Sequence, residues 1–469
     1  MRTNRLVPLI VACALFMEQL DSTVIATSLP AMAADLGEDP IALKLALTSY
    51  LLSLAVFIPA SGWVADRFGT RTVFRAAIVV FTLGSVMCGI ASSLPELVAS
   101  RILQGMGGAM MVPVGRLVIL RTVPKSELVS ALAWLTIPAL TGPVLGPPIG
   151  GFITTYFNWR YIFFINVPIG LLGLVLVTRF IEDIREPNLG RFDFVGMMLS
   201  GAGLAGLVFG AALLGHEAMP ASVALGVGAF GAVAMALYVR HARRVERPIL
   251  DLGLLAIPTF RIGVCGASLF RIGIGAMPFL LPLLLQLGFG LTPFASGLVT
   301  FASAAGAMTM KVAAGPIIRA FGFRRVLVVN AFIAGSFIAV SALFAPGVPL
   351  ALISACLLAG GFFRSLQFTA ANALTYADVP TEAMSRATSF ASVAQQVSIA
   401  TGVAVGALTL EGMQALRGDA TLTVPDFAVA FLVVAAIGLT SVLFFIRLPE
   451  DAGAEMAGRG KRVEVDVES

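Results

Sequence analysis

Apolar residues run in long unbroken stretches along this chain, and short polar turns separate the stretches. Each stretch has about 20 residues, the length that an α-helix needs to cross about 30 Å of hydrocarbon. The stretches are continuous rather than alternating, which excludes a membrane β-barrel. The pattern predicts fourteen spans, near 6–29, 42–64, 73–93, 96–120, 129–153, 161–180, 194–214, 221–240, 262–287, 293–317, 326–344, 348–371, 388–410 and 427–446.

The composition agrees with an all-α polytopic membrane protein. The chain is 58% hydrophobic and 12% charged, with a mean hydropathy of +0.95, which leaves too little polar surface for a soluble globular protein. The first stretch carries Glu18 and Asp21 and shows no small-residue cleavage site, so we interpret it as a retained span and not as a signal peptide. All four cysteines lie in apolar stretches, which indicates packing roles and no disulfide framework.

Basic residues of the turns are distributed unequally between the two sides. If the N-terminus is cytoplasmic, most of the 31 lysines and arginines fall on the cytoplasmic side, and only Lys44, Arg160 and Arg417 fall in turns on the other. Cytoplasmic loops of membrane proteins carry such an excess. The bias predicts cytoplasmic N- and C-termini, and it explains the net charge of +5 without a nucleic-acid partner.

A ten-residue sequence occurs twice. The first copy follows the second span and reads Gly62-Trp-Val-Ala-Asp66-Arg67-Phe-Gly69-Thr-Arg71. A degraded copy, from Gly315 to Arg324, follows the tenth span. This predicts a doubled six-helix unit with two extra helices between the copies, and doubled units are typical of transporters. The expected parts are an N-terminal bundle, a two-helix insert, a C-terminal bundle and a cytoplasmic tail, over 1–187, 188–247, 248–449 and 450–469.

Seven charged side chains stand out within the predicted spans, where each charge at mid-bilayer costs from about 3 to more than 10 kcal/mol: Glu18, Asp21, Arg101, Arg116, Arg271, Lys311 and Arg364. Glu18 and Asp21 share one helix face because they are three residues apart. The offset between the two loop copies makes Arg271 the counterpart of Glu18, so we expect this acid and this base to face each other between the halves.

Buried carboxylates that take up and release protons suit proton coupling. For Glu18 and Asp21 the alternative is hydrogen bonding that packs helices. For Arg101 and Arg364 it is a structural ion pair or a bond to backbone carbonyls. Arg116 and Lys311 lie closer to the cytoplasmic ends, where long side chains can extend to the interface.

The fifth span contains a stripe of small residues interrupted by prolines: Gly142, Pro143, Gly146, Gly150 and Gly151. Small residues at this spacing let a neighbouring backbone approach closely, and prolines remove helix hydrogen bonds. The stripe predicts tight packing, or a hinge or seal that opens during transport, and the two are compatible.

Five motifs in this order resemble those of the major facilitator superfamily, specifically its fourteen-span drug:proton antiporter group. They are the Gly62–Arg71 loop, Arg101-Ile-Leu-Gln104-Gly105-Met-Gly107-Gly108, the stretch from Gly142 to Gly151, Leu20 to Pro30, and Asn158 to Pro168. The resemblance implies two six-helix bundles plus two extra helices in the bacterial cytoplasmic membrane. It also implies a central cavity lined by spans 1, 4, 9 and 12, and a role for Arg101 in proton coupling.

The expected function is proton-coupled efflux of small amphipathic compounds by alternating access, with no cofactor beyond the proton gradient and no metal. Asp21 and Glu18 would exchange the proton, Arg101 would tune them, and the loop at Asp66, Arg67 and Arg71 would hold a cytoplasmic gate. The expected cavity residues are Gln104, Arg271, Arg364, Gln367, Asn372 and Gln395. The expected partners are a small-molecule substrate, protons and lipid; the protein is expected to be a monomer, with a periplasmic adaptor left open.

An alternative keeps the fold and changes the cargo to a specific metabolite or organic anion, clamped by Arg271 and Arg364. These two arginines make the C-terminal wall positive, which argues against a purely cationic drug profile. Arg319 replaces the aspartate of the second loop copy, so we expect the intact first copy to carry the stronger gate. A sensor or an enzyme has less support, because the chain shows no inserted signalling domain and no nucleophile–base set.

Overall fold

The computed structural model describes residues 3–123, 128–186, 190–214, 220–419, 421–454 and 456. Within these residues, 13 helices are long and apolar enough to cross a membrane. A further 29-residue helix, α7 (Leu128–Tyr156), occupies the predicted position of the fifth span. Each of the fourteen predicted spans is therefore helical, and the all-α polytopic fold is confirmed.

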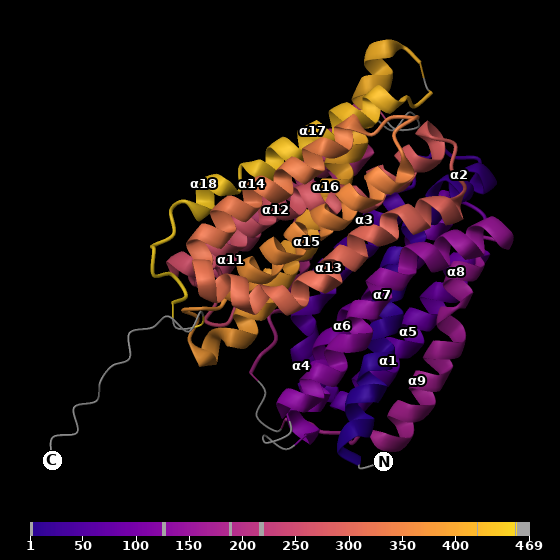
Figure 1. Ribbon diagram of the computed structural model, residues 1–469. Helices are drawn as coiled ribbons and strands as arrows, with labels where there is room; N and C mark the ends of the chain where they lie inside the picture. The colour runs from indigo at the N-terminus through magenta and orange to yellow at the C-terminus, as the bar shows by residue number, and fades with distance from the viewer. Residues whose placement is uncertain are drawn as a thin grey trace.

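The helices form two bundles that lie side by side in Figure 1. The N-terminal bundle contains α1 (Thr3–Val24), α2 (Leu29–Leu36), α3 (Lys44–Phe57), α4 (Ser61–Phe68), α5 (Thr70–Ile90), α6 (Leu94–Thr122), α7, α8 (Tyr161–Phe164) and α9 (Asn166–Phe180). The C-terminal bundle contains α12 (Pro258–Leu283), α13 (Pro293–Phe321), α14 (Phe323–Val340), α15 (Leu350–Thr375), α16 (Met384–Arg417), α17 (Val424–Leu439) and α18 (Val442–Phe445). We call the end of the molecule that carries residues 62–71 the loop side, and the opposite end the far side.

Local sequence signals explain where helices begin and turn. Ser93 caps α6 by accepting a hydrogen bond from the Glu96 amide, and Thr292 caps α13 in the same way. Gly69, between α4 and α5, has φ +97°, and Gly322, between α13 and α14, has φ +77°. Glycine adopts such angles without a steric penalty. The two glycines hold the same position in the two loop copies, so the repeated sequence is also a repeated backbone turn.

The insert consists of α10 (Phe194–Leu213) and α11 (Ala221–Ala242), which pack against each other, while α10 also packs on α3 and α16. A Cβ on Gly206 would lie 2.6 Å from the Cα of Gly231, so only glycine permits this separation. Leu225 and Phe230 are exposed on α11, as expected for a lipid-facing helix. The domain boundaries stay a prediction, and the one at residue 187 lies outside the described residues.

The two halves contact each other through α7 on α13 and through α3 on α16. At the far side, Lys44 Nζ lies 2.6 Å from Glu411 Oε1, and Lys44 is fully buried. A Cβ on Gly151 would lie 2.3 Å from the carbonyl oxygen of Pro293, which shows how closely α7 and α13 approach at this side. The far-side ends of the halves are therefore held together by an ion pair and by close backbone packing.

Candidate functional site

A buried ion pair joins α1 to α6 in the N-terminal bundle. Arg101 Nη1 lies 2.6 Å from Asp21 Oδ2, and the two side chains are 1% and 0% exposed. Gln104 and Asn166 each donate from their amide nitrogen to Asp21 Oδ1, both at 2.8 Å. The negative charge of Asp21 is therefore compensated by one cation and two neutral donors, which is what a buried charge requires.

The same cluster connects α1, α3, α5, α6 and α9. Arg101 also donates to the carbonyl oxygen of Ala46 at 3.3 Å and lies 4.1 Å from the centre of the Tyr50 ring. Ser85 accepts from Gln104 at 2.7 Å and from Asn166 at 3.2 Å. Asn166 and Ser85 were not among the predicted site residues. The sequence could have indicated Asn166, because a lone amide inside an apolar span needs a hydrogen-bond partner, as a charge needs a counter-charge.

Glu18 lies one turn from Asp21 on α1 and is differently satisfied. It is 5% exposed, and it accepts hydrogen bonds from Gln19 at 2.9 Å and from the Tyr50 hydroxyl at 3.3 Å. Both donors are neutral, and none of the ion pairs in the described parts of the chain includes Glu18. Asp21 and Glu18, which were predicted to act together, therefore differ: Asp21 has a cationic partner and Glu18 has only neutral donors.

The expected opposition of Glu18 and Arg271 is not found as a contact. Arg271 donates from Nη2 to Asn372 Oδ1 at 2.6 Å, and its guanidinium lies 5.1 Å from the centre of the Phe368 ring. The repeat offset gave the depth of Arg271 in the membrane and not its direction, and each of these two charges finds its polar partner inside its own half. Arg271 Nε is buried and lacks a hydrogen-bond partner.

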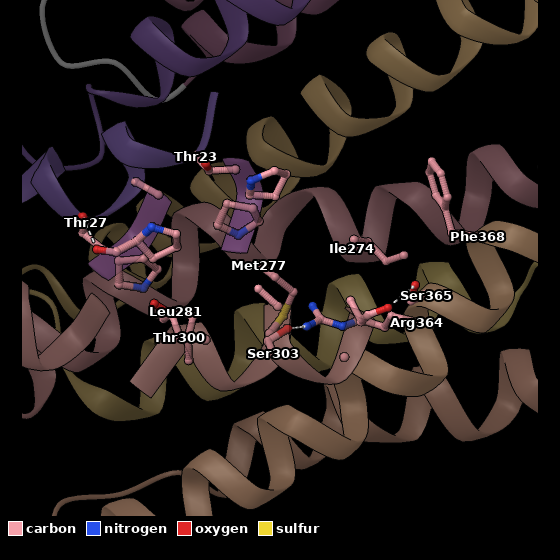
Figure 2. Close-up of a pocket in the computed structure, with 18 residues that line it drawn as sticks. Thr23, Thr27, Ile274, Met277, Leu281, Thr300, Ser303, Arg364, Ser365 and Phe368 are labelled. Atoms are coloured by element: carbon pink, nitrogen blue, oxygen red, sulfur yellow. Dashed lines mark hydrogen bonds between the residues drawn. The ribbon is translucent and has the colours of Figure 1, made fainter. Parts of the chain in front are cut away.

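A cavity of about 330 Å³ lies between the halves. Its walls come from α1, α7, α12, α13, α15 and the short 3₁₀ segment Ile25–Ser28 (Figure 2). The predicted cavity helices were spans 1, 4, 9 and 12. Span 4, which is α6, contributes no residue to the lining, because its polar side chains face the Asp21 cluster; α7 and α13 contribute in its place.

Arg364 is the only one of the six predicted cavity residues in the lining, and the only charged residue there among those the structure describes. It donates to Ser303 Oγ, as Figure 2 shows, and to the Gly360 carbonyl oxygen at 3.3 Å. The other five predicted residues lie outside the lining: Gln104, Arg271, Gln367, Asn372 and Gln395. Gln367 is fully buried and accepts from Asn330 at 2.8 Å. Substrate contact by these five stays a prediction.

The glycine stripe of α7 packs on the first span. A Cβ on Gly142 would lie 2.9 Å from Gln19 Cβ, one on Gly146 2.1 Å from Thr23 Oγ1, and one on Gly150 2.2 Å from the Val24 carbonyl oxygen. Pro143, in the same stripe, lines the cavity. The stripe therefore brings α7 close to α1 at the cavity wall, and its role as a hinge stays a prediction.

The loop copy at Gly62–Arg71 is attached to its own bundle. Asp66 Oδ1 lies 2.7 Å from Arg121 Nη2 on α6. Asp183, after α9, accepts from the Thr72 amide at 3.1 Å and from Arg185 at 3.3 Å. Burial raises the pKa of Asp183, but these hydrogen bonds and the charges of Arg185 and Arg71 outweigh it and hold the pKa below its usual value. Arg67 is exposed. The loop thus braces the loop side of one half, and gating stays a prediction.

The two glycines of this loop should respond differently to alanine. At Gly69, φ is +97° and a Cβ would lie 2.2 Å from Asp183 Oδ1, whereas a Cβ on Gly62 meets nothing within 4 Å. Gly69→Ala is expected to cost at least about 1 kcal/mol, because the residue is forced into a left-handed conformation. Gly62→Ala, inside α4, should be neutral or stabilising. Thermal unfolding of the two purified variants checks this, and equal unfolding temperatures would contradict it.

Comparisons with known proteins agree with this architecture. The family model of the Major Facilitator Superfamily matches residues 11–260 and 263–464. A protein of Cronobacter sakazakii that carries the provisional name multidrug resistance protein MdtD is 40% identical over 451 residues, which cover 94% of each chain. Its namesake in Salmonella typhimurium is 39% identical over 97% of each chain.

Two solved structures show the same fold at low sequence identity. A D-xylose-proton symporter aligns with a TM-score of 0.68 at 16% identity, covering 96% of this chain and 98% of that one. A POT family transporter in complex with 5-aminolevulinic acid aligns with a TM-score of 0.65 at 14% identity, covering 93% of this chain and 94% of the other. With the family-model match, the extended relatives and these neighbours all in agreement, this multi-pass membrane protein belongs to the major facilitator superfamily.

Proposed function

We propose that this protein exports small amphipathic compounds across the cytoplasmic membrane in exchange for protons. The observation that carries the proposal is Glu18, a carboxylate 5% exposed inside the membrane span, with only neutral donors around it. It lies on the helix whose Thr23 lines the cavity. The names of the relatives favour drug efflux as the direction and class of transport.

The two carboxylates have different roles in this proposal. A buried carboxylate without a cation is costly while charged, so Glu18 carries the proton when the site is closed and releases it when substrate and water enter. Asp21 and Arg101 form a buried ion pair at 2.6 Å, and this pair acts as a positioning group. Arg101 packs on the Tyr50 ring and the Tyr50 hydroxyl donates to Glu18, which links the pair to the proton carrier.

The contacts between the halves support alternating access as the mode of transport. The far side is closed by Lys44–Glu411 and by the approach of Gly151 to Pro293. On the loop side, Lys311 lies one turn beyond the cavity residue Ala307, on the same face of α13, and is exposed. The loop side faces the cytoplasm in this proposal. Separation of the far-side contacts would open the cavity outward.

A pH gradient imposed on proteoliposomes tests the proposal. The panel contains cationic ethidium, zwitterionic norfloxacin and anionic naphthalene-2-sulfonate. We expect at least one compound to move against its gradient in the direction opposite to the protons, and to stop when an ionophore removes the pH difference. Transport of a panel compound at a rate that ignores the pH gradient would show that proton antiport is wrong.

Arg364 favours a second candidate function, export of one specific organic anion. It is the only charged residue in the described lining of the cavity. Narrow selectivity for a single anion in the same assay, with no competition from other amphipathic compounds, would support this candidate over broad efflux.

A further inference from the structure

We propose that the cavity recognises the anionic group of an amphipathic organic acid through Arg364. The proposal rests on the proposed function, because it names the substrate class that the same cavity accepts. A carboxylate or sulfonate would bind the guanidinium, and an apolar body of one or two rings would lie against α12.

Arg364 lacks a counter-charge in the described parts of the chain. Its hydrogen-bond acceptors are the Ser303 hydroxyl and the Gly360 carbonyl oxygen, and both are neutral. A charge held in the hydrocarbon region without an opposite charge is costly. A guanidinium is also a planar donor that matches a carboxylate or sulfonate at two points. An anionic ligand would therefore supply the missing negative charge and accept hydrogen bonds from the guanidinium.

The surrounding half of the protein reinforces this charge. The sequence from Pro258 to Tyr376, which contains α12, α13, α14 and α15, has no aspartate or glutamate. Arg271 adds a second cation, which is 4% exposed and whose only hydrogen-bond partner in the described chain is the neutral Asn372. It lies over Phe368, and Phe368 lines the cavity. The positive potentials of the two arginines add in the cavity, where the low dielectric keeps them strong.

The N-terminal half offers little to a cation. The charge of Asp21 is balanced by Arg101 at 2.6 Å, and neither residue lines the cavity. Glu18 is also outside the lining. A cationic substrate would meet Arg364 and no carboxylate at the described wall, so the electrostatics of the cavity favour an anion over a cation.

The rest of the wall suits an apolar body. Ile274, Met277, Leu281 and Phe368 are apolar lining residues, and the volume of about 330 Å³ falls at the small end of ligand pockets. In Figure 2, Arg364 points toward Ser303 beside Met277, so the charged group and the apolar wall are adjacent. A compact molecule with one anionic end fits this arrangement.

Binding of three naphthalene probes of nearly equal shape tests the proposal on the purified full-length protein in detergent. The probes are naphthalene-2-carboxylate, naphthalene-2-carboxamide and 2-naphthylmethylammonium. We expect the carboxylate to bind about tenfold or more tightly than the carboxamide, since charge-assisted hydrogen bonds are about twice as strong as neutral ones. The ammonium should bind weakest.

Substitutions at Arg364 and Lys311 test which residue causes the preference for the carboxylate probe. Arg364→Gln should lower carboxylate affinity about tenfold and leave carboxamide affinity unchanged, and Arg364→Lys should keep part of the preference. Lys311→Gln removes the same charge one turn beyond the lining and is the matched control, expected to change neither affinity. Arg364→Gln should unfold at the same or a higher temperature, because it removes a partly buried charge that has no counter-charge in the described chain.

Several results would overturn the proposal: equal affinity of wild type for carboxylate and carboxamide, tightest binding of the ammonium, or no carboxylate binding at millimolar concentration. An equal loss of carboxylate affinity in Lys311→Gln would show that the overall positive potential, and not contact with Arg364, attracts the anion. A lower unfolding temperature of Arg364→Gln would show that Arg364 has a structural role. The assay needs no pH gradient, so anion selectivity can fail while proton-coupled transport of other panel compounds stands, and the reverse.

Discussion

Replacing Arg101 by alanine is expected to leave little folded protein. The substitution removes the cation that lies 2.6 Å from Asp21 and strands that carboxylate at 0% exposure. Removing one partner of a buried ion pair costs about 3–5 kcal/mol, which is a large part of the total stability of about 5–15 kcal/mol that is typical of proteins. The yield of monodisperse protein and its unfolding temperature in detergent measure the effect.

A surface ion pair supplies the matched control. Arg324 lies 3.2 Å from Glu450, and the two side chains are 33% and 90% exposed. Arg324→Ala should cost no more than about 1 kcal/mol, as exposed pairs do. Arg101→Lys keeps a cation but loses the planar contact with Tyr50, and should be intermediate. Equal unfolding temperatures for Arg101→Ala and Arg324→Ala would contradict the assignment of Arg101 to a structural and positioning pair.

Replacing Glu18 by glutamine is expected to abolish gradient-driven transport while substrate binding is retained. The amide oxygen can still accept from the Tyr50 hydroxyl, which donates to Glu18 at 3.3 Å, so the local packing survives. An amide does not release a proton near neutral pH, so the variant cannot exchange one for substrate. Uptake into proteoliposomes under a pH gradient should fall to the level of protein-free liposomes.

Two comparisons make this prediction specific. Glu18→Asp keeps an ionisable group and should retain part of the coupling. Glu382→Gln removes an exposed carboxylate between α15 and α16 and should transport as wild type does. Undiminished gradient-driven uptake by Glu18→Gln would show that the proton is carried elsewhere.

The fold was predictable because the length and order of the apolar stretches along the chain determine it. The length of an apolar stretch indicates a membrane span. The repeated loop sequence, with Gly69 in the first copy and Gly322 in the second, indicates the doubled unit and the insert between the halves. The depth of a residue in the membrane follows from its position along a span. Glu18, Asp21, Arg101 and Arg364 were identified as site candidates in this way.

What the sequence did not predict is the direction in which side chains point. Arg271 and Glu18 lie at corresponding positions of the repeat, yet Arg271 binds Asn372 within its own half. Gln104 was expected at the cavity and instead donates to Asp21. Both depend on helix rotation and tilt, which packing decides. Asn166 was not predicted as a site residue, although a buried amide requires hydrogen-bond partners and Asn166 donates to Asp21.

Proton release on substrate binding tests the central claim most directly. Purified protein in weakly buffered detergent solution is mixed with a panel compound that binds it, and a pH-indicator dye reports the protons released. The account predicts release by wild type, and none by Glu18→Gln at the same substrate occupancy. Binding without proton release in wild type, or equal release by wild type and Glu18→Gln, would contradict it.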